Sequence, residues 1–448
     1  MAADEFATVR TPRGAAEQDR PAADASRFRV AMGQTGDSVF RCEQFRPLIV
    51  FGPQRSGKTT GIVVPAVLEW AGPCLTTSVR LDVIEQTIAH RSTLGRTFIF
   101  DPGGLIGSAS EALAPHSVGW SPLDNVNTFG DAVRRAYGLT EGAETGGMTN
   151  AAFWNVQARS LLAPLLFAAA NSQGTMGDVL SWLALTAGDL IDEIRGRCPE
   201  PILDANSADP TDWGRCLRQI IGFEGMYMET FSIVEATALN ALAVFSFPEV
   251  ERRCRAGGLQ LDTFFDGGAH TLYMCAPPQD QQNFLPLFTA LVREVLTLAY
   301  QRAQNATDEH APLMLCLDEA GNIARLDNLD TIATTAAGSR IQLVSVFHDM
   351  SQLQACYGQD RSRLIVNNHS GKLFLPGNSD PLTNEFLMSL LRDSDVRLLP
   401  HKGWNFSDLR RLDDDQLLCV YGKLPPIILR PRRSWEPDSY LARLSNVA

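Results

Sequence analysis

The sequence predicts an α/β fold in which a parallel sheet flanked by helices is interrupted by an all-α block. Strand-like apolar runs alternate with helical patterns from residue 46 to about residue 139, which is typical of a parallel sheet with helices on its faces. From Phe153 to about Cys254 the apolar residues instead follow a helical period almost throughout. The alternation returns at Thr271–Cys275, so the sheet is expected to resume after the block.

The composition is that of a globular protein with an acidic balance. The chain has 448 residues, of which 45% are apolar, enough for two or three domains and a large core. Its formal net charge is −12 and its pI is about 5.1. This charge excludes a surface that is basic overall. Any contact with nucleic acid would therefore use a local basic patch or pore.

The cysteines and the apolar runs indicate a cellular compartment. Nine scattered cysteines include no C-x-x-C pair and no zinc-ligand spacing. We expect them to be reduced thiols that act as small core residues, with Cys275 and Cys316 in buried strands. No run reaches the roughly 18 apolar residues that span a bilayer, and the N-terminus lacks a signal peptide's apolar stretch. These observations predict a soluble, cytoplasmic chain without a transmembrane segment.

The first part of the chain contains an expected tail and the start of the α/β core. Residues 1–27 are rich in Ala, Asp, Glu, Arg and Pro and have almost no large apolar side chains, which predicts a disordered tail. The first part of the core is expected at residues 28–140 and opens with a short strand pair. The strand-like and helical runs that follow are Pro47–Phe51, Thr59–Trp70, Cys74–Thr77, Asp82–Arg91 and Thr97–Asp101.

The middle of the chain is expected to form an all-α insertion at residues 141–260. A Gly- and Thr-rich break, Glu141–Asn150, precedes it, and Pro201–Thr211 is expected to be a loop inside it. One apolar helix face in this block consists of Leu161, Leu162, Leu165 and Leu166.

The core is expected to resume at residues 261–436, followed by a tail at residues 437–448. After Arg430 the sequence is rich in Pro and Arg, and we expect it to run over the surface. The strand-like and helical runs of this part are Thr271–Cys275, Phe284–Arg302, Leu313–Leu317, Ile341–Phe347, Lys372–Leu375 and Leu417–Tyr421.

One G-x-x-x-x-G-K-T motif stands between a strand-like run, Leu48–Phe51, and a helical pattern. A phosphate-binding loop needs this order, because glycines let backbone N–H groups surround a β-phosphate and the helix adds its positive N-terminus. Lys58 is predicted to reach the β- and γ-phosphates of ATP, and the hydroxyl of Thr59 to hold Mg²⁺. The predicted nucleotide-binding residues are Gly52, Pro53, Gln54, Arg55, Ser56, Gly57, Lys58, Thr59 and Thr60.

A second motif ends the apolar run Leu313–Leu317 with two acids. Asp318 is predicted to complete the Mg²⁺ shell through water, and Glu319 to polarise the attacking water as a general base. This pair favours ATP hydrolysis over a kinase or GTPase reaction. Lys58 and Asp318 are 260 residues apart, more than one P-loop core needs, and the helical block accounts for the excess. The predicted fold is a RecA-like P-loop ATPase core with an inserted all-α domain.

A competing interpretation starts from Asp101. The sequence Asp101-Pro-Gly-Gly104 also follows an apolar strand and fits the D-x-x-G pattern of GTPases. However, the sequence contains no N-K-x-D motif for reading guanine. The ATPase hypothesis is therefore preferred, with the GTPase hypothesis left open.

Several segments resemble one known family. They are Gly57–Pro65, with an early proline in the P-loop helix, Trp120–Leu123, which departs from a W-N-P-L turn at Ser121, Phe153-Trp154, and Leu317–Ala324. Over roughly residues 46–436 the chain resembles the coupling proteins of type IV secretion and conjugation, the TraG/TraD-like motor ATPases. The resemblance implies that the helical insertion recruits substrate. Members commonly carry N-terminal transmembrane helices, and this sequence has none. Three explanations stay open: a soluble branch of the family, a fragment, or an anchor supplied by another subunit, which would place the chain at the inner face of the cell membrane.

The resemblance also suggests further site residues. Ser351-Gln352-Leu353 resembles the family's sensor region, which makes Gln352 a candidate catalytic residue, with a structural role for Gln352 as the open alternative. The family usually has Gln four positions before this Q-L pair, where this chain has His348. Arg340, just before Ile341–Phe347, is the candidate arginine that a neighbouring subunit supplies to the γ-phosphate.

The function implied by the resemblance is an ATP-driven motor that recruits and translocates a substrate. The expected cofactors are ATP and Mg²⁺. The expected partners are single-stranded DNA with its relaxase, or secreted proteins, together with type IV secretion subunits and other copies of the chain in a hexameric ring. Two alternatives stay open: an FtsK-like pump for double-stranded DNA, and a nucleotide-gated adaptor that binds partners without pumping. Candidate aromatic platforms for single strands are Tyr357, Trp404 and Trp435.

Overall fold

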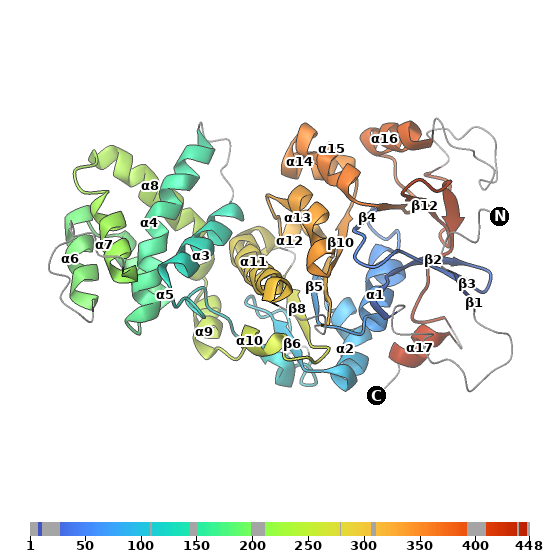
Figure 1. The fold of residues 1–448 in the computed structure, drawn as a ribbon, viewed down its shortest axis with the longest axis horizontal. Coiled ribbons are helices and arrows are strands. Elements are labelled where there is room, and N and C mark those ends of the chain that lie inside the picture. The colour runs from blue at the N-terminus through green and yellow to red at the C-terminus, as the bar shows by residue number, and fades with distance from the viewer. Residues whose placement is uncertain are drawn as a thin grey trace.

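The computed structural model describes residues 8–10, 27–107, 110–143, 150–198, 211–277, 279–305, 311–391, 409–436 and 439–445. A lobe of helices forms one end of the elongated molecule, an α/β core forms its middle, and a small antiparallel sheet lies at the opposite end (Figure 1). The lobe consists of elements from the middle of the sequence, so the chain leaves the core and returns to it.

Within the described residues, ten strands form the central sheet, in the order β13-β12-β11-β4-β10-β9-β5-β8-β6-β7. From β11 to β7 the neighbouring strands are parallel, whereas β12 and β13 continue the sheet in antiparallel fashion. The predicted parallel sheet is confirmed. The strands are β4 (Leu48–Phe51), β5 (Cys74–Ser78), β6 (Thr97–Phe100), β7 (Ser117–Val118), β8 (Thr271–Cys275), β9 (Leu313–Leu317), β10 (Ile341–Phe347), β11 (Gly371–Phe374), β12 (Leu417–Tyr421) and β13 (Ile427–Leu429).

Strand β8 shows how the chain after the helical block rejoins the core. It pairs in parallel with β5 on one side and with β6 on the other. Both neighbours precede the block in the sequence, so the two parts of the core complete one sheet. This arrangement agrees with the predicted insertion into a single RecA-like core.

The two faces of the sheet pack into different cores. On β4, Leu48 and Val50 join one core with α1 and α2, whereas Ile49 and Phe51 join the other core with α11. Successive side chains of a strand point to opposite faces, so a sheet covered on both faces needs apolar residues at nearly every position. The helices of the α/β core are α1 (Val64–Glu69), α2 (Asp82–Leu94), α11 (Gln281–Asn305), α12 (Ala320–Ile323), α13 (Leu329–Thr335), α14 (Met350–Tyr357), α15 (Gln359–Asn368) and α16 (Pro381–Leu391).

Helix α4 forms the centre of the helical block. Its predicted apolar face, Leu161, Leu162, Leu165 and Leu166, is fully buried. The helix packs against α5, α7 and α8. Of the predicted loop at residues 201–211, only Thr211 belongs to the described residues. The helices of the block are α4 (Ala151–Asn171), α5 (Met176–Leu183), α6 (Ala187–Arg197), α7 (Asp212–Ile221), α8 (Met228–Ala241), α9 (Pro248–Ala256) and α10 (Leu261–Phe264).

Helix α3 (Phe129–Glu141) crosses the expected boundary between residues 140 and 141. It packs against α4 of the block and against α11 of the core. Gly138 permits the second contact, because a Cβ atom there would lie 2.9 Å from Cα of Ala290. The apolar pattern of α3 predicts a buried face but does not identify the helices that cover it. The helix is therefore shared by both parts of the chain.

The expected disordered tail at residues 1–27 contains a strand. Strand β1 (Thr8–Arg10) pairs antiparallel with β3 (Ser38–Arg41), which also pairs with β2 (Ala31–Thr35). The expectation of disorder is wrong for these three residues, because backbone pairing with the edge of a hairpin needs no apolar side chains. The predicted strand pair before the phosphate-binding loop is confirmed as β2 and β3.

The expected C-terminal tail also packs against the core. Helix α17 (Tyr440–Ser445) buries Leu441 to 1% exposure in the same core as α1 and α2. Arg432 and Arg41 both bind the Glu69 carboxylate, at 2.7 and 2.9 Å. A single buried leucine and a buried ion pair do not produce an apolar periodicity in the sequence. The sequence therefore predicts a surface segment here instead.

Within the described residues, no helix is long and apolar enough to cross a membrane. All the cysteines are free, and only Cys198 and Cys356 are partly exposed. Cys275 and Cys316 are buried in β8 and β9 as predicted.

Candidate nucleotide-binding site

A cavity of about 450 Å³ opens at the carboxyl ends of the parallel strands. Ligands of open α/β sheets bind at this edge. The lining comes from the loop after β4, the end of β5 and the segment after it, the first residue of α11, the acids after β9 with α12, and the residue after β10. The residues that line it are Gln54, Arg55, Ser56, Gly57, Lys58, Thr59, Thr60, Ser78, Val79, Arg80, Asp82, Gln281, Asp318, Glu319, Asn322 and His348.

The loop between β4 and the next helix needs glycine at two positions. Gly57 has φ +89°, in the left-handed region that side chains disfavour. A Cβ atom on Gly52 would lie 2.4 Å from Oγ of Ser56. Each of the predicted residues 54–60 lines the cavity, whereas Gly52 and Pro53 contribute backbone carbonyls beneath it.

The early proline in the P-loop helix has a local explanation. The helix begins as a π-helix over Thr59–Val63 and becomes α-helical at Val64. Pro65 therefore lies in the first turn of the α-helical part, where a missing N–H is tolerated. Gly61 lets this helix approach the C-terminal segment, because a Cβ atom there would lie 2.9 Å from Cβ of Pro431.

Lys58 is held by its own loop. Its ammonium donates to the carbonyls of Gly52 at 2.6 Å and Pro53 at 2.9 Å, and lies 3.3 Å from Nδ1 of His348. Burial lowers the pKa of this ammonium, while the carboxylates of Asp318 and Glu319 act in the opposite direction. The lysine is thus a positive group at the floor of the cavity, where a phosphate oxygen could take one of its donors.

Thr59 and Asp318 meet across the cavity. The Thr59 hydroxyl donates to Oδ2 of Asp318 at 2.8 Å, and the Thr77 hydroxyl holds the Asp318 backbone carbonyl at 2.8 Å. Oδ1 of Asp318 is buried and has no hydrogen-bond partner in the part of the chain that the structure describes. Burial raises the pKa of Asp318 to about 6. An unsatisfied carboxylate oxygen beside a hydroxyl fits a hard divalent cation such as Mg²⁺.

Glu319 occupies a conformation that is uncommon for its residue type. Its backbone has φ 56°, in the left-handed region, at the start of α12. Asn322 donates to its Oε2 at 2.7 Å, and Nε2 of His348 lies 3.4 Å from the same oxygen. Burial acts to raise the pKa of Glu319, but these contacts and the charge of Lys58 outweigh it and lower the pKa. The side chain is therefore kept as a carboxylate.

Gln352 lies behind the cavity wall. Its Oε1 accepts the backbone N–H of His348 at 2.8 Å, and its Nε2 donates to Oδ1 of Asn322 at 3.3 Å. Among the described residues that line the cavity, His348 is present and Gln352 is not. The Gln352 side chain thus contacts the backbone of His348 and the side chain of Asn322, and its candidate catalytic role stays a prediction.

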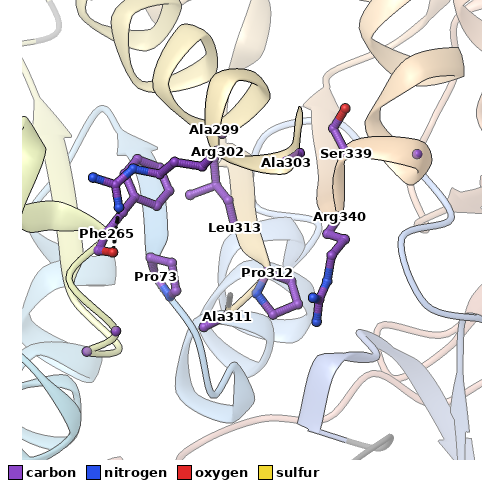
Figure 2. A pocket seen from close by; sticks show the side chains of 13 residues that line it. Pro73, Phe265, Ala299, Arg302, Ala303, Ala311, Pro312, Leu313, Ser339 and Arg340 are labelled. Carbon is purple, nitrogen blue, oxygen red and sulfur yellow. Dashed lines mark hydrogen bonds between the residues drawn. The ribbon is translucent and has the colours of Figure 1, made fainter. Parts of the chain in front are cut away.

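Arg340 lies at the opposite edge of the sheet. It precedes β10, which runs parallel to β4, so Arg340 is at the amino ends of strands whose carboxyl ends carry the P-loop. Figure 2 shows its side chain lining a different cavity, of about 320 Å³, with Arg302 across from it. Within one chain the structure does not bring Arg340 to the nucleotide site.

Asp101 has a structural role in the described chain. It is fully buried, and its carboxylate accepts the backbone N–H groups of Leu105 and Ile106, both at 2.8 Å. Strands β5 and β8 separate its strand, β6, from β9. These contacts give the acid after β6 a structural role within its own loop.

Arg80 and Asn322 also line the cavity, although neither was predicted as a site residue. Arg80 follows β5, and the rule that ligands bind at carboxyl ends of parallel strands could have indicated it. Asn322 lies in the short helix α12 that Glu319 precedes, and its side chain reaches back to the Glu319 carboxylate.

Comparisons with known proteins place this geometry in a family context. A family model described as Type IV secretory system Conjugative DNA transfer matches residues 9–393. Protein VirD4 of Rhizobium rhizogenes is 22% identical over 440 residues, which cover 91% of this chain and 61% of the relative. Conjugal transfer protein TraG of Escherichia coli is 23% identical over 372 residues, which cover 77% of this chain and 54% of the relative. The chain thus spans less than two thirds of the length of these relatives.

Solved structures share the fold. The unbound monoclinic form of the bacterial conjugative coupling protein TrwBdeltaN70 is 18% identical with a TM-score of 0.64, and the match covers 86% of this chain and 85% of that chain. Plasmid coupling protein TrwB in complex with ADP and Mg²⁺ is 19% identical with a TM-score of 0.64, over 87% of this chain and 86% of that chain. These likenesses confirm the predicted fold class.

Proposed function

Because this chain belongs to the type IV secretory family of conjugative DNA-transfer proteins, we propose that it is a coupling protein that hydrolyses ATP to recruit and translocate a substrate. The proposed substrate is single-stranded DNA with its bound relaxase, or a secreted protein. The observation that carries the proposal is that Lys58, Thr59, Asp318 and Glu319, from two distant motifs, line one cavity.

The residues Thr59 and Asp318 fit a magnesium ion. Hydroxyl and carboxylate oxygens are ligands that Mg²⁺ prefers, and Oδ1 of Asp318 lacks a hydrogen-bond partner among the described residues. When bound, the ion supplies positive charge against the β- and γ-phosphate oxygens. The complex of TrwB with ADP and Mg²⁺ supports the same choice of cofactor.

The chain's own groups provide the rest of the proposed chemistry. Lys58 binds the phosphate oxygens of ATP, and the loop backbone and helix N-terminus stabilise their negative charge. Glu319 orients the attacking water and accepts its proton as the γ-phosphoryl group is transferred. The lowered pKa of Glu319 keeps this base unprotonated at neutral pH.

A neighbouring copy is proposed to complete the site in a hexameric ring. Arg340 is at the edge of the sheet opposite its own P-loop, so it can serve a nucleotide only on another subunit. An arginine supplied in this way stabilises the charge of the transferring phosphoryl group. This proposal makes activity depend on assembly.

The helical block is the proposed site of substrate recruitment. Large apolar side chains are exposed at the starts of its helices, with Tyr227 85% and Met228 83% exposed at α8, and Phe153 53% exposed at α4. Apolar side chains exposed in this way are typical of contacts with partners. Other proposed partners are type IV secretion subunits, at the cytoplasmic face of the cell membrane.

One observation favours a nucleotide-gated adaptor as a second candidate. Glu319 is held by both Asn322 and His348, and a base held in this way would turn over ATP slowly. A turnover assay with and without single-stranded DNA separates the two. The motor hydrolyses ATP, is stimulated by DNA, and loses turnover but not ATP binding in Glu319→Gln. The adaptor binds ATP without turnover under either condition.

A further inference from the structure

The ring of His348 lies between two oppositely charged groups of the nucleotide site, Lys58 and Glu319. Its Nδ1 lies 3.3 Å from Nζ of Lys58, and its Nε2 lies 3.4 Å from Oε2 of Glu319. Lys58 can only donate and a carboxylate can only accept. The neutral ring with its proton on Nε2 satisfies both contacts at once, whereas a second proton on Nδ1 would set two cations against each other.

A second set of contacts fixes the position of this ring. The backbone N–H of His348 donates to Oε1 of Gln352 at 2.8 Å. The other end of the Gln352 amide donates to Asn322 at 3.3 Å, and Asn322 donates to Oε2 of Glu319 at 2.7 Å. Gln352 therefore holds both residues that contact one carboxylate oxygen of Glu319.

The three donors of Lys58 are all engaged in this arrangement. Two of them bind the carbonyls of Gly52 and Pro53 at 2.6 and 2.9 Å, and the third faces His348 at 3.3 Å. A phosphate oxygen can gain a donor from Lys58 only by displacing one of these acceptors. The contact with His348 is the longest of the three, and His348 lines the cavity, so it is the contact that a phosphate displaces first.

From this geometry we propose that His348 is a latch on Glu319 that a nucleotide phosphate opens through Lys58. This inference rests on the proposed ATP hydrolysis and concerns its resting state. In the arrangement described here, His348 and Asn322 together hold Oε2 of Glu319. When a phosphate takes the donor of Lys58, Nδ1 loses its partner and the ring is released from its bridging position. Oε2 of Glu319 then loses one of its two contacts and can accept a hydrogen bond from water in its place, so His348 is a positioning residue rather than a catalytic one.

Substitutions of His348 that keep its contact with either Lys58 or Glu319, but not both, test the latch. His348→Asn places an amide oxygen near the position of Nδ1, within reach of Lys58 but too short for Glu319. His348→Gln places an amide N–H near the position of Nε2, which can still hold Glu319. The latch predicts that His348→Ala and His348→Asn raise ATP turnover without DNA by about tenfold, the loss of one ordinary hydrogen bond. His348→Gln stays at or below the wild-type rate.

The opposite ranking of ATP turnover among these variants overturns the latch. Turnover that falls in the Ala and Asn variants but is retained by Gln shows that a polar group at position 348 assists the reaction directly. Glu319→Gln serves as the control that assigns turnover to this site. If neither the wild type nor these variants hydrolyses ATP, the proposed function fails, and a binding measurement then decides on the latch.

That measurement is an NMR spectrum of the full chain labelled with ¹⁵N at histidine, with His348→Asn to assign the signal. The latch predicts a neutral ring with its proton on Nε2 when nucleotide is absent. Adding a nonhydrolysable ATP analogue with Mg²⁺ moves the Nδ1 signal in the same direction as Lys58→Met, which removes the donor. A proton on Nδ1, or a signal that the analogue leaves in place, overturns the proposal.

Discussion

The hydroxyl of Thr59 donates to Oδ2 of Asp318 at 2.8 Å, although 259 residues separate them in sequence. The contact joins the phosphate-binding loop, which follows β4, to the acid that follows β9. Strands β4 and β9 lie on either side of β10 in the sheet. The chain leaves the sheet to form the helical block and rejoins it at β8, so the block does not separate the two residues in space. The two motifs therefore act as one site.

Asp318→Asn is expected to raise the Mg²⁺ concentration needed for half-maximal ATP turnover by about tenfold or more. The variant keeps an oxygen for the Thr59 hydroxyl but loses the negative charge that attracts the ion. Turnover is measured against Mg²⁺ at saturating ATP. Asp82→Asn, in the same cavity, is the matched control and should leave the Mg²⁺ requirement nearly unchanged. Equal Mg²⁺ requirements for wild type and Asp318→Asn would exclude Asp318 from the ion's shell.

Asp318 also predicts a pH dependence of stability in the absence of Mg²⁺ and nucleotide. Burial raises its pKa from 3.8 to about 6, so the folded chain holds this proton more tightly than the unfolded chain. The contribution of the group to stability is thus fully present below about pH 4 and is lost as pH rises through 6. The loss amounts to about 3 kcal/mol. Asp318→Asn should be the more stable protein at pH 8, with a difference that shrinks toward pH 4. Denaturant unfolding at both pH values checks this.

Glu69→Gln is expected to destabilise the fold by about 3 kcal/mol, because it leaves Arg41 and Arg432 buried without their carboxylate. Burial acts to raise the pKa of Glu69, but the two arginines outweigh it and lower the pKa. The stabilisation is therefore present above the ordinary value of 4.5 and is lost as pH falls through the folded-state pKa. Urea unfolding should show that the difference in the free energy of unfolding between variant and wild type becomes smaller at acid pH.

The exposed pair Arg46–Glu43 provides the control for this prediction. Its side chains are 54% and 64% exposed, so Glu43→Gln should have little effect. If Glu69→Gln lowers the free energy of unfolding as little as Glu43→Gln does, the ion pair between Glu69 and Arg432 does not stabilise the C-terminal segment.

Mixing two inactive variants tests the proposed role of Arg340. Arg340→Ala should lose turnover while each subunit still binds ATP, and Lys58→Ala should lose turnover through its own P-loop. In mixed rings an intact P-loop faces an intact arginine at some interfaces, so the mixture should recover part of the activity. Turnover that is constant per subunit down to monomer concentrations would rule out a shared site.

The parts of this structure that the sequence predicts are those with a strong local signal. The apolar runs of β4, β9 and β10 predict strands because both faces of the sheet are buried, and the P-loop has one functional geometry. The contacts of Gln352 with His348 and Asn322 could not be predicted, because they depend on which way a side chain turns after β10. The sharing of α3 between α4 and α11 depends on tertiary packing that its apolar pattern does not specify.

The most direct test of ATP hydrolysis at this site is phosphate release from ATP and Mg²⁺ by the wild type and Lys58→Ala. Lys58 contacts its own loop carbonyls and His348, so its removal should leave the fold and the thermal melting curve nearly intact. We predict that the wild type releases phosphate and that turnover falls by about 100-fold or more in the variant, because the phosphates lose their cation. Wild-type turnover in a folded Lys58→Ala protein would contradict the account.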